Sequence, residues 1–187
     1  MQGVRSTSGA YSRRVNLAVT SASISDLPCL ETLWKTMVEH HRRLVGHQWP
    51  VHRADVAWEL RRQQYATWLA DSTGFLFIAR STESGRQLGY VACRLVPTGP
   101  TFDLGYIRGE VDSLVTADNA RGQGVASALL DACRGELKRR GAHYWSVGVV
   151  EGNAQAIQLY ERLGFRSFVR TMLAPLDGIP RSAQSGS

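Results

Sequence analysis

Cysteine is scarce in this chain of 187 residues, and long apolar runs are absent. Cys29, Cys93 and Cys133 stand far apart without a CxxC pair, which argues against a disulfide framework and a zinc knuckle. All three fall in apolar stretches, so we expect small buried hydrophobic residues. No stretch approaches the roughly 18 apolar residues of a membrane span, and the N-terminus lacks the apolar core of a signal peptide. The sequence therefore predicts no membrane partner and a cytoplasmic location.

The chain is only mildly basic, with 22 Lys and Arg residues, 16 Asp and Glu residues and a net charge of +6. Four of the arginines and one aspartate lie in residues 1–14 and 177–187, which leaves a net charge of +3 between these ends. The remaining basic doublets are not interleaved with aromatic residues. This pattern does not favour a nucleic-acid partner.

Apolar spacing predicts one domain over residues 14–176, between flexible polar tails at 1–13 and 177–187. Strands are expected at 15–22, 74–81, 87–96, within 101–116, at 143–150 and at 165–176, and helices at 25–44, 54–71, 124–140 and 153–164. A run of strands precedes the part in which strands and helices alternate. This order predicts an α/β (α+β) fold with a mixed sheet flanked by helices.

A glycine-containing turn connects the strand that ends at Thr116 to the helix that follows it. Gly122 and Gly124 have no Cβ atom, so a ligand can approach the main chain closely. The first turn of the helix leaves N–H groups unpaired, and the helix dipole favours a negative charge there. Arg121 adds a guanidinium suited to phosphate oxygens. The sequence therefore predicts a phosphate site in this turn.

Two familiar phosphate-binding motifs do not fit this turn. A P-loop requires GxxxxGK[ST], whereas Val125 and Ala126 follow Gly124. A dinucleotide fingerprint requires GxGxxG, and the chain has "GQGVAS", with Glu151 where the ribose-binding acid would lie. Too few residues follow Glu151 to complete a doubly wound domain.

A third motif fits, because "RGQGVA" matches the acyl-coenzyme A loop [QR]-x-x-G-x-[GA]. Upstream, "EVDSLVT" looks like the central strand of the GCN5-related N-acetyltransferase (GNAT) superfamily, and downstream "GNAQAIQLYERLGF" is similar to its N-x-x-A-x-x-x-Y-x-x-x-G-F segment. The chain thus resembles this superfamily over residues 15–175, in the order of elements as well. The resemblance implies a mostly antiparallel central sheet, flanked by helices and splayed at the central strands.

The resemblance also implies that acetyl-coenzyme A (acetyl-CoA) is the cosubstrate. Main-chain N–H groups of the turn would hold its pyrophosphate, and these belong to Arg121, Gly122, Gln123, Gly124, Val125 and Ala126. The main chain of Leu114, Val115 and Thr116 would pair with the pantetheine arm. Asn153 would contact the cofactor, or cap its helix, or both.

Transfer of acetyl to an amine needs a group that takes a proton from the amine and a group that returns one to the thiolate. Glu110 is the candidate base, because some family members have a catalytic glutamate there. Strict alternation also places Glu110 on the strand face of Leu114 and Thr116. Asp112 shares that face and is the rival, and a water chain is the third alternative. Tyr160 is the candidate general acid.

Histidines crowd the loop between the first two helices. This region forms the acceptor wall in the family, so the resemblance implies that His47, Trp49 and His52 contact the acceptor. Their spacing, together with that of His40 and His41, matches no metal site. We therefore expect an N-acetyltransferase that moves acetyl directly to a primary amine of a small molecule or a peptide. A homodimer is compatible with this function. The alternative is a non-catalytic acyl-CoA-binding sensor on the same fold.

Overall fold

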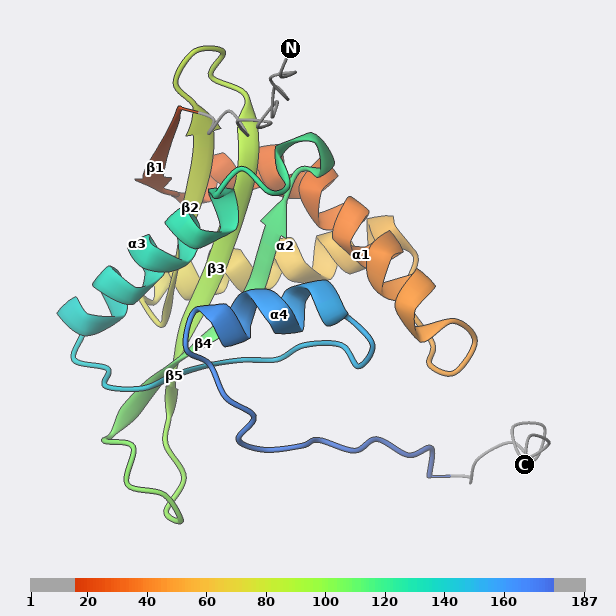
Figure 1. Ribbon diagram of the computed structural model, residues 1–187, viewed down its shortest axis with the longest axis vertical. Helices are drawn as coiled ribbons and strands as arrows, with labels where there is room; N and C mark the ends of the chain where they lie inside the picture. The colour runs from red at the N-terminus through yellow and green to blue at the C-terminus, as the bar shows by residue number, and fades with distance from the viewer. Residues whose placement is uncertain (1–15, 177–187) are drawn as a thin grey trace, which may run out of the picture.

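Five strands form one sheet in the order β1-β2-β3-β4-β5 in the computed structural model, which describes residues 16–176 (Figure 1). The strands are β1 (Leu17–Ser21), β2 (Gly74–Ser81), β3 (Gln87–Pro97), β4 (Ile107–Thr116) and β5 (Trp145–Val147). All neighbours are antiparallel except β4 and β5, which are parallel. The expected mixed and mostly antiparallel sheet is confirmed. The two expected tails lie outside the described residues.

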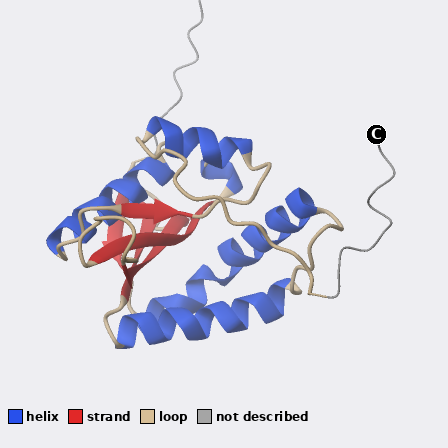
Figure 2. Cartoon of the chain, turned by 90° about the horizontal axis from the view of Figure 1, so that it is seen from below, coloured by secondary structure: helices blue, strands red, loops and turns tan. Residues whose placement is uncertain are grey.

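Helices cover both faces of the sheet (Figure 2). They are the 3-10 helices η1 (Ile24–Leu30) and η2 (Asp118–Ala120), and the α-helices α1 (Glu31–Val45), α2 (Ala54–Ala70), α3 (Val125–Arg139) and α4 (Ala154–Arg162). In Figure 1, α3 and α4 lie in front of the sheet, and α1 and α2 lie behind it. The sheet is therefore the middle of three layers, with a separate hydrophobic core on each side.

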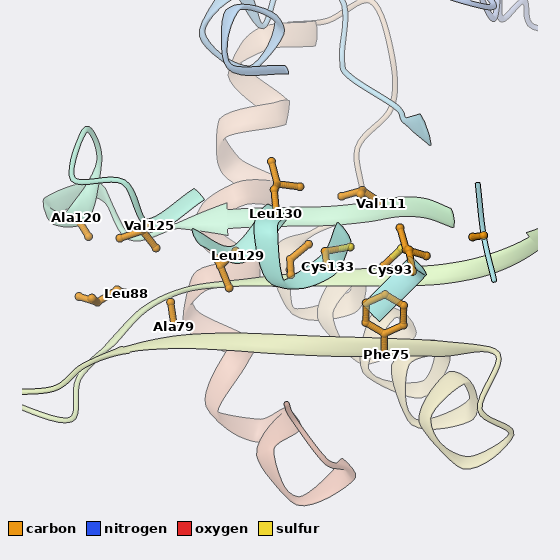
Figure 3. Close-up of a cluster of buried hydrophobic side chains, with 13 residues drawn as sticks. Phe75, Ala79, Leu88, Cys93, Val111, Ala120, Val125, Leu129, Leu130 and Cys133 are labelled. Atoms are coloured by element: carbon orange, nitrogen blue, oxygen red, sulfur yellow. The ribbon is translucent and has the colours of Figure 1, made fainter. Parts of the chain in front are cut away.

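The first core lies between α3 and the front of the sheet. Val125, Leu129, Cys133 and Leu137 recur at every fourth position of α3, and each is at most 3% exposed. Figure 3 shows this apolar stripe of the helix lying over the strands, with Cys133 beside Cys93 of β3. The spacing seen in the sequence thus fixes which side of α3 faces the sheet, and with it the position of the glycine turn before the helix.

The second core lies between the back of the sheet and the helices α1, α2 and η1. Tyr65 of α2 and Tyr90 of β3 are fully buried at its centre, with their hydroxyl oxygens 3.4 Å apart. Trp34 of α1 meets Tyr65 edge to face at 6.3 Å between ring centroids. Burial raises the pKa of both phenols, so the two tyrosines stay neutral in this core.

The strand β4 changes its facing direction in the middle of the sheet. The pairing with β3 slips, because Ala92 faces Ser113 and Cys93 faces Val111, which leaves Asp112 as an extra residue. Val111 consequently packs in the first core and Val115 in the second. Without this bulge, residues four apart on a strand would point to the same side.

The strands β4 and β5 separate after a short contact, as the resemblance implied. Their pairing is confined to Gly109–Val111 of β4 and Trp145–Val147 of β5. The β3 side of β4 remains paired as far as Thr116. The second half of β4 therefore has one edge of main-chain groups that β5 does not use.

Three expected elements differ in length or type. The helix expected over 25–44 is divided into η1 and α1, and Pro28 lies within η1, where it lacks an N–H group. The strand expected within 101–116 begins only at Ile107. The strand expected over 143–150 is reduced to the three residues of β5.

The strand expected over 165–176 is wrong, because this segment pairs with no other part of the described chain. In Figure 1 it is the blue segment that runs on from α4 without joining the sheet. Its apolar residues recur at intervals of three and four rather than two, which does not suit a strand. Phe168 packs on Phe102, with ring centroids 4.7 Å apart, and Met172 is 87% exposed.

The expectation that the cysteines are buried is confirmed for two of the three. Cys93 and Cys133 are buried, whereas Cys29 is exposed on η1. Its thiol donates a hydrogen bond to the carbonyl of Asp26 and accepts one from the side chain of Gln87. Cys29 is therefore a surface residue and not a core residue.

Candidate functional site

The glycine turn forms an open cradle at the N-terminus of α3. Gly122 and Gly124 have φ values of +73° and +85°, in the left-handed region that glycine tolerates best. An added Cβ at either position would meet nothing within 4 Å, so the space above both glycines is open. Gly124 caps α3, and the first turn of that helix has no acidic residue. The free N–H groups and the helix dipole together make this end of α3 attractive to an anion.

Arg121 lies beside this cradle and is half-exposed. Its guanidinium pairs with Asp118 at 2.8 Å, in the short helix η2 immediately before the turn. Both partners are solvent-accessible, so the pair is weak and leaves the arginine free to reorient toward a phosphate. The predicted side-chain contact is therefore geometrically available.

A cleft of about 480 Å³ extends from this cradle between the splayed strands. Its walls are the N-terminus of α3 and the second half of β4 on one side, and the end of β5 with α4 on the other. The predicted cofactor residues that line it are Leu114, Val115, Thr116, Arg121, Gly122, Gly124, Val125, Ala126 and Asn153. The structure thus brings nine of the ten residues together around one cavity.

The tenth residue, Gln123, does not line the cleft. Its amide nitrogen donates a hydrogen bond of 2.8 Å to the carbonyl of Asn119. Its carbonyl oxygen is buried and accepts no hydrogen bond from the described residues. The side chain of Gln123 therefore stabilises the turn through this hydrogen bond, outside the lining of the cleft.

Asn153 and Tyr160 both face the cleft from α4. Asn153 caps the helix by accepting a hydrogen bond of 3.2 Å from the N–H of Ala156, so its capping role is present. The ring of Tyr160 packs on Phe165 and against the first core. Burial raises the pKa of Tyr160 to about 12, so its phenol carries a proton at neutral pH.

Glu110 does not line the cleft, and two arginines hold its carboxylate. Arg94 lies 2.7 Å from one oxygen and Arg108 lies 3.1 Å from the other. Burial alone would raise the pKa of Glu110, but the hydrogen bond and charge of Arg94, followed by those of Arg108, outweigh it and lower the pKa. A carboxylate with a lowered pKa is a weaker base.

Glu110 and Leu114 do not share a strand face, so this expectation is wrong. Because of the bulge at Asp112, Leu114 packs against the first core, on the α3 side. The partner of Glu110, Arg94, lies over the ring of Trp68 in α2, on the opposite side of the sheet. Alternation along a strand predicts facing direction only where the pairing is regular.

Asp112 lines the cleft and lies on the α2 side of the bulge. It pairs with Arg61 of α2 at 2.6 Å, and it accepts a hydrogen bond of 2.7 Å from the hydroxyl of Ser113. Its side chain is 16% exposed. The carboxylate of Asp112 therefore contacts helix α2 on one side and the cleft on the other.

Histidines of α1, and not those of the loop that follows it, lie at the cleft. His47, Trp49 and His52 do not line it, whereas His40 and His41 of α1 do. Burial, followed by the charge of His40, lowers the pKa of His41, so His41 is neutral at neutral pH. The expected residues lie in or beside the loop after α1. Helical spacing could have linked these histidines to the cleft. His40 and His41 lie one turn after Met37, which also lines it.

Residues 16–176 contain neither of two features that would suggest another kind of function. No group of three or more His, Cys, Asp or Glu side chains in this part of the chain is arranged to hold a metal ion. No helix there is both long enough and apolar enough to span a membrane.

The chain matches the family model for the acetyltransferase (GNAT) family over residues 34–165. A relative from Pseudomonas paraeruginosa, an L-methionine sulfoximine/L-methionine sulfone acetyltransferase, is 27% identical over 81% of this chain and 81% of its own length. A GCN5-related N-acetyltransferase structure from Ralstonia eutropha has a TM-score of 0.69 at 20% identity, over 87% of this chain and all of that one.

A second solved structure shares the fold and contains acetyl-CoA. It is a predicted acetyltransferase from Clostridium acetobutylicum with acetyl-CoA, with a TM-score of 0.67 at 19% identity, and the match covers 86% of this chain and 96% of that one. The family match spans most of the chain, and it includes the turn, the splayed strand and α4. The protein therefore belongs to the GNAT family of acetyltransferases.

Proposed function

We propose that this acetyltransferase moves acetyl from acetyl-CoA directly to the primary amine of a small molecule. The observation that carries the proposal is the single cleft in which an anion cradle, a free strand edge and a protonated tyrosine follow one another. An acyl-CoA molecule has a pyrophosphate, an amide-bearing pantetheine arm and a thioester in the same order.

The residues present suit this donor. The open space above Gly122 and Gly124, and the N–H groups at the start of α3, would hold the pyrophosphate. The main chain of residues 114–116 would pair with the amides of the pantetheine arm, since β5 leaves that edge free. The bound donor supplies an acetyl thioester, which an uncharged amine can attack.

Two side chains of the cleft would move the protons. Asp112 is better placed than Glu110 to accept a proton from the amine, directly or through water, because it lines the cleft. Tyr160 would donate its proton to the sulfur as the carbon–sulfur bond breaks and the carbon–nitrogen bond forms. The amine loses one proton and the thiolate gains one, so the transfer needs no covalent acyl-enzyme.

The relative from Pseudomonas paraeruginosa supports a small-molecule acceptor, because its substrates are small amines. L-Methionine sulfone is therefore a suitable first acceptor. A panel would add a polyamine, an aminoglycoside and a peptide with a free N-terminus, and release of the free thiol from acetyl-CoA would report each transfer.

The roles of the residues are tested by three conservative variants. We expect Tyr160→Phe and Asp112→Asn each to lower kcat by about 100-fold or more while acetyl-CoA affinity stays near that of the wild type. Glu110→Gln should have the smaller effect. If Glu110→Gln instead loses more than Asp112→Asn, Glu110 is the base and our assignment of Asp112 is wrong.

Binding of acetyl-CoA without amine-dependent thiol release from any acceptor would contradict the proposal. That outcome would favour a non-catalytic acyl-CoA sensor. Direct titration of acetyl-CoA by calorimetry, run beside the transfer assay, separates the two outcomes.

A further inference from the structure

Three arginines and two carboxylates lie together on the α2 side of the sheet, and one of the carboxylates, Asp112, lines the cleft. Arg61 pairs with Asp112, and Arg94 and Arg108 pair with Glu110. We call Arg61, Arg94 and Arg108 the arginine cluster. Since Asp112 also lines the cleft, the Arg61–Asp112 pair connects this cluster to it.

Arg61 is held in place by aromatic rings as well as by its ion pair with Asp112. Its guanidinium carbon lies 4.9 Å from the ring centre of Trp34 and 5.6 Å from that of Tyr65. Only Nη1 donates to a described residue, namely Asp112, so the remaining N–H groups of this 22% exposed side chain have capacity for another acceptor. The indole N–H of Trp34 is buried and likewise has no partner in the described chain.

Arg94 extends the positive charge along the same surface. Its guanidinium and that of Arg61 each lie 5.8 Å from the ring centre of Trp68, so one indole ring lies beside both. Two nitrogens of Arg94 bond to Glu110, and its side chain is 41% exposed. Arg108 shares Glu110 and also donates to the hydroxyl of Ser146.

The charges of this surface do not cancel. Three guanidiniums face two carboxylates, and both oxygens of Glu110 are already taken by arginines. An acceptor with several positive charges would meet net repulsion here. An acceptor with a carboxylate would satisfy the unused donors of Arg61 and Arg94 in the bidentate manner that guanidinium favours.

We infer that the acceptor is an α-amino acid, with its amine at Asp112 and its carboxylate at Arg61 and Arg94. One carbon separates the amine from the carboxylate in such a molecule, and Asp112 and Arg61 are likewise direct neighbours at 2.6 Å. This inference rests on the proposed amine acetylation. It adds that the arginine cluster selects the acceptor by its carboxylate.

The experiment compares acceptors that differ only in the carboxylate. L-Methionine sulfone and L-leucine are assayed beside their methyl esters, with γ-aminobutyrate and spermidine as further acceptors, and thiol release from acetyl-CoA gives kcat/KM. For the wild type we expect each free acid to exceed its ester by about 10- to 100-fold, the worth of a charge-assisted hydrogen bond. γ-Aminobutyrate and spermidine should be poor acceptors.

The same ratio of acid to ester is then measured in three variants. Arg61→Gln and Arg94→Gln should each reduce it by about 10-fold, because the carboxylate loses a guanidinium. Arg134→Gln, which removes an exposed arginine paired with Asp131 on α3, is the matched control and should leave the ratio unchanged. Loss of fold would lower both rates together, and the more exposed Arg94 provides a second test should Arg61→Gln be unstable.

The outcomes separate this inference from the proposed function. Equal rates with acid and ester, an unchanged ratio in both cluster variants, or transfer to spermidine or a peptide but to no amino acid would each overturn the inference and leave amine acetylation standing. No transfer to any amine would overturn the proposed function and the inference with it.

Discussion

The two walls of the cleft are built very differently. The wall of β4 and α3 is part of the first core, and α3 has five buried residues. The wall of β5 and α4 has a strand of three residues and a helix without a buried residue. Tyr160 of α4 and Leu163, which follows the helix, pack against the first core.

This difference separates two tasks in one site. The cradle at Gly124 starts a helix that the core holds fixed, so its N–H groups keep their direction without a ligand. Tyr160 belongs to the less buried wall, so its position depends more on what fills the cleft. We therefore expect the donor to bind a rigid site and to tie α4 to it.

The largest expected effect on stability comes from the same substitution, leucine to alanine, made once in each wall. Leu129 of α3 is fully buried, whereas Leu159 of α4 is only partly buried. Leu129→Ala should lower the free energy of unfolding by about 2–5 kcal/mol through lost burial and a cavity. Leu159→Ala should lower it by about 1 kcal/mol or less. Urea unfolding without acetyl-CoA measures both, and equal losses would contradict the contrast between the walls.

A smaller effect on stability is expected from a substitution in the glycine turn. Gly124→Ala places a side chain in the left-handed region and in the open space of the cleft, and should cost about 1–2 kcal/mol of stability. The same change should lower acetyl-CoA affinity by about 10-fold or more, measured by calorimetry. Gly135→Ala, within the same helix and with open space around it, should instead stabilise by about 0.5–1 kcal/mol and leave affinity unchanged.

The smallest expected effect concerns His41 in the α1 part of the cleft. Burial lowers its pKa in the folded protein, so the unfolded chain takes up the proton first, near its ordinary value of about 6.5. Stability is therefore present above that pH and is lost as the pH falls below it. His41→Gln should remove this loss of stability, which we expect to be under about 1 kcal/mol because solvent screens the partly exposed ring. The exposed His47→Gln is the control, and equal pH profiles for both variants would contradict the assignment.

The sequence predicted the rigid wall better than the other. The every-fourth-residue stripe of α3 and the glycines before it depend on local rules, and the structure places them as expected. The bulge at Asp112 depends on how β4 pairs with β3, which no local pattern shows, and it puts Glu110 and Leu114 on opposite sides of the sheet. The segment 165–176 had apolar residues but not the alternation of a strand, and it pairs with nothing in the described chain.

The arginine cluster could not have been found from spacing. Arg61, Arg94 and Arg108 belong to α2, β3 and β4, and only the folded sheet brings them to one surface. In the sequence, Arg61 was one half of a basic doublet. Its neighbour Arg62 pairs with Glu59 on the exposed side of α2, so adjacent arginines have different surroundings.

The most direct test of the central claim is amine-dependent release of free thiol from acetyl-CoA by the wild-type chain, with the acceptor product identified by mass spectrometry. The account predicts thiol release only when an amine is present, and a product that has gained one acetyl group on its nitrogen. Binding of acetyl-CoA with no acetylated amine from any acceptor would contradict it.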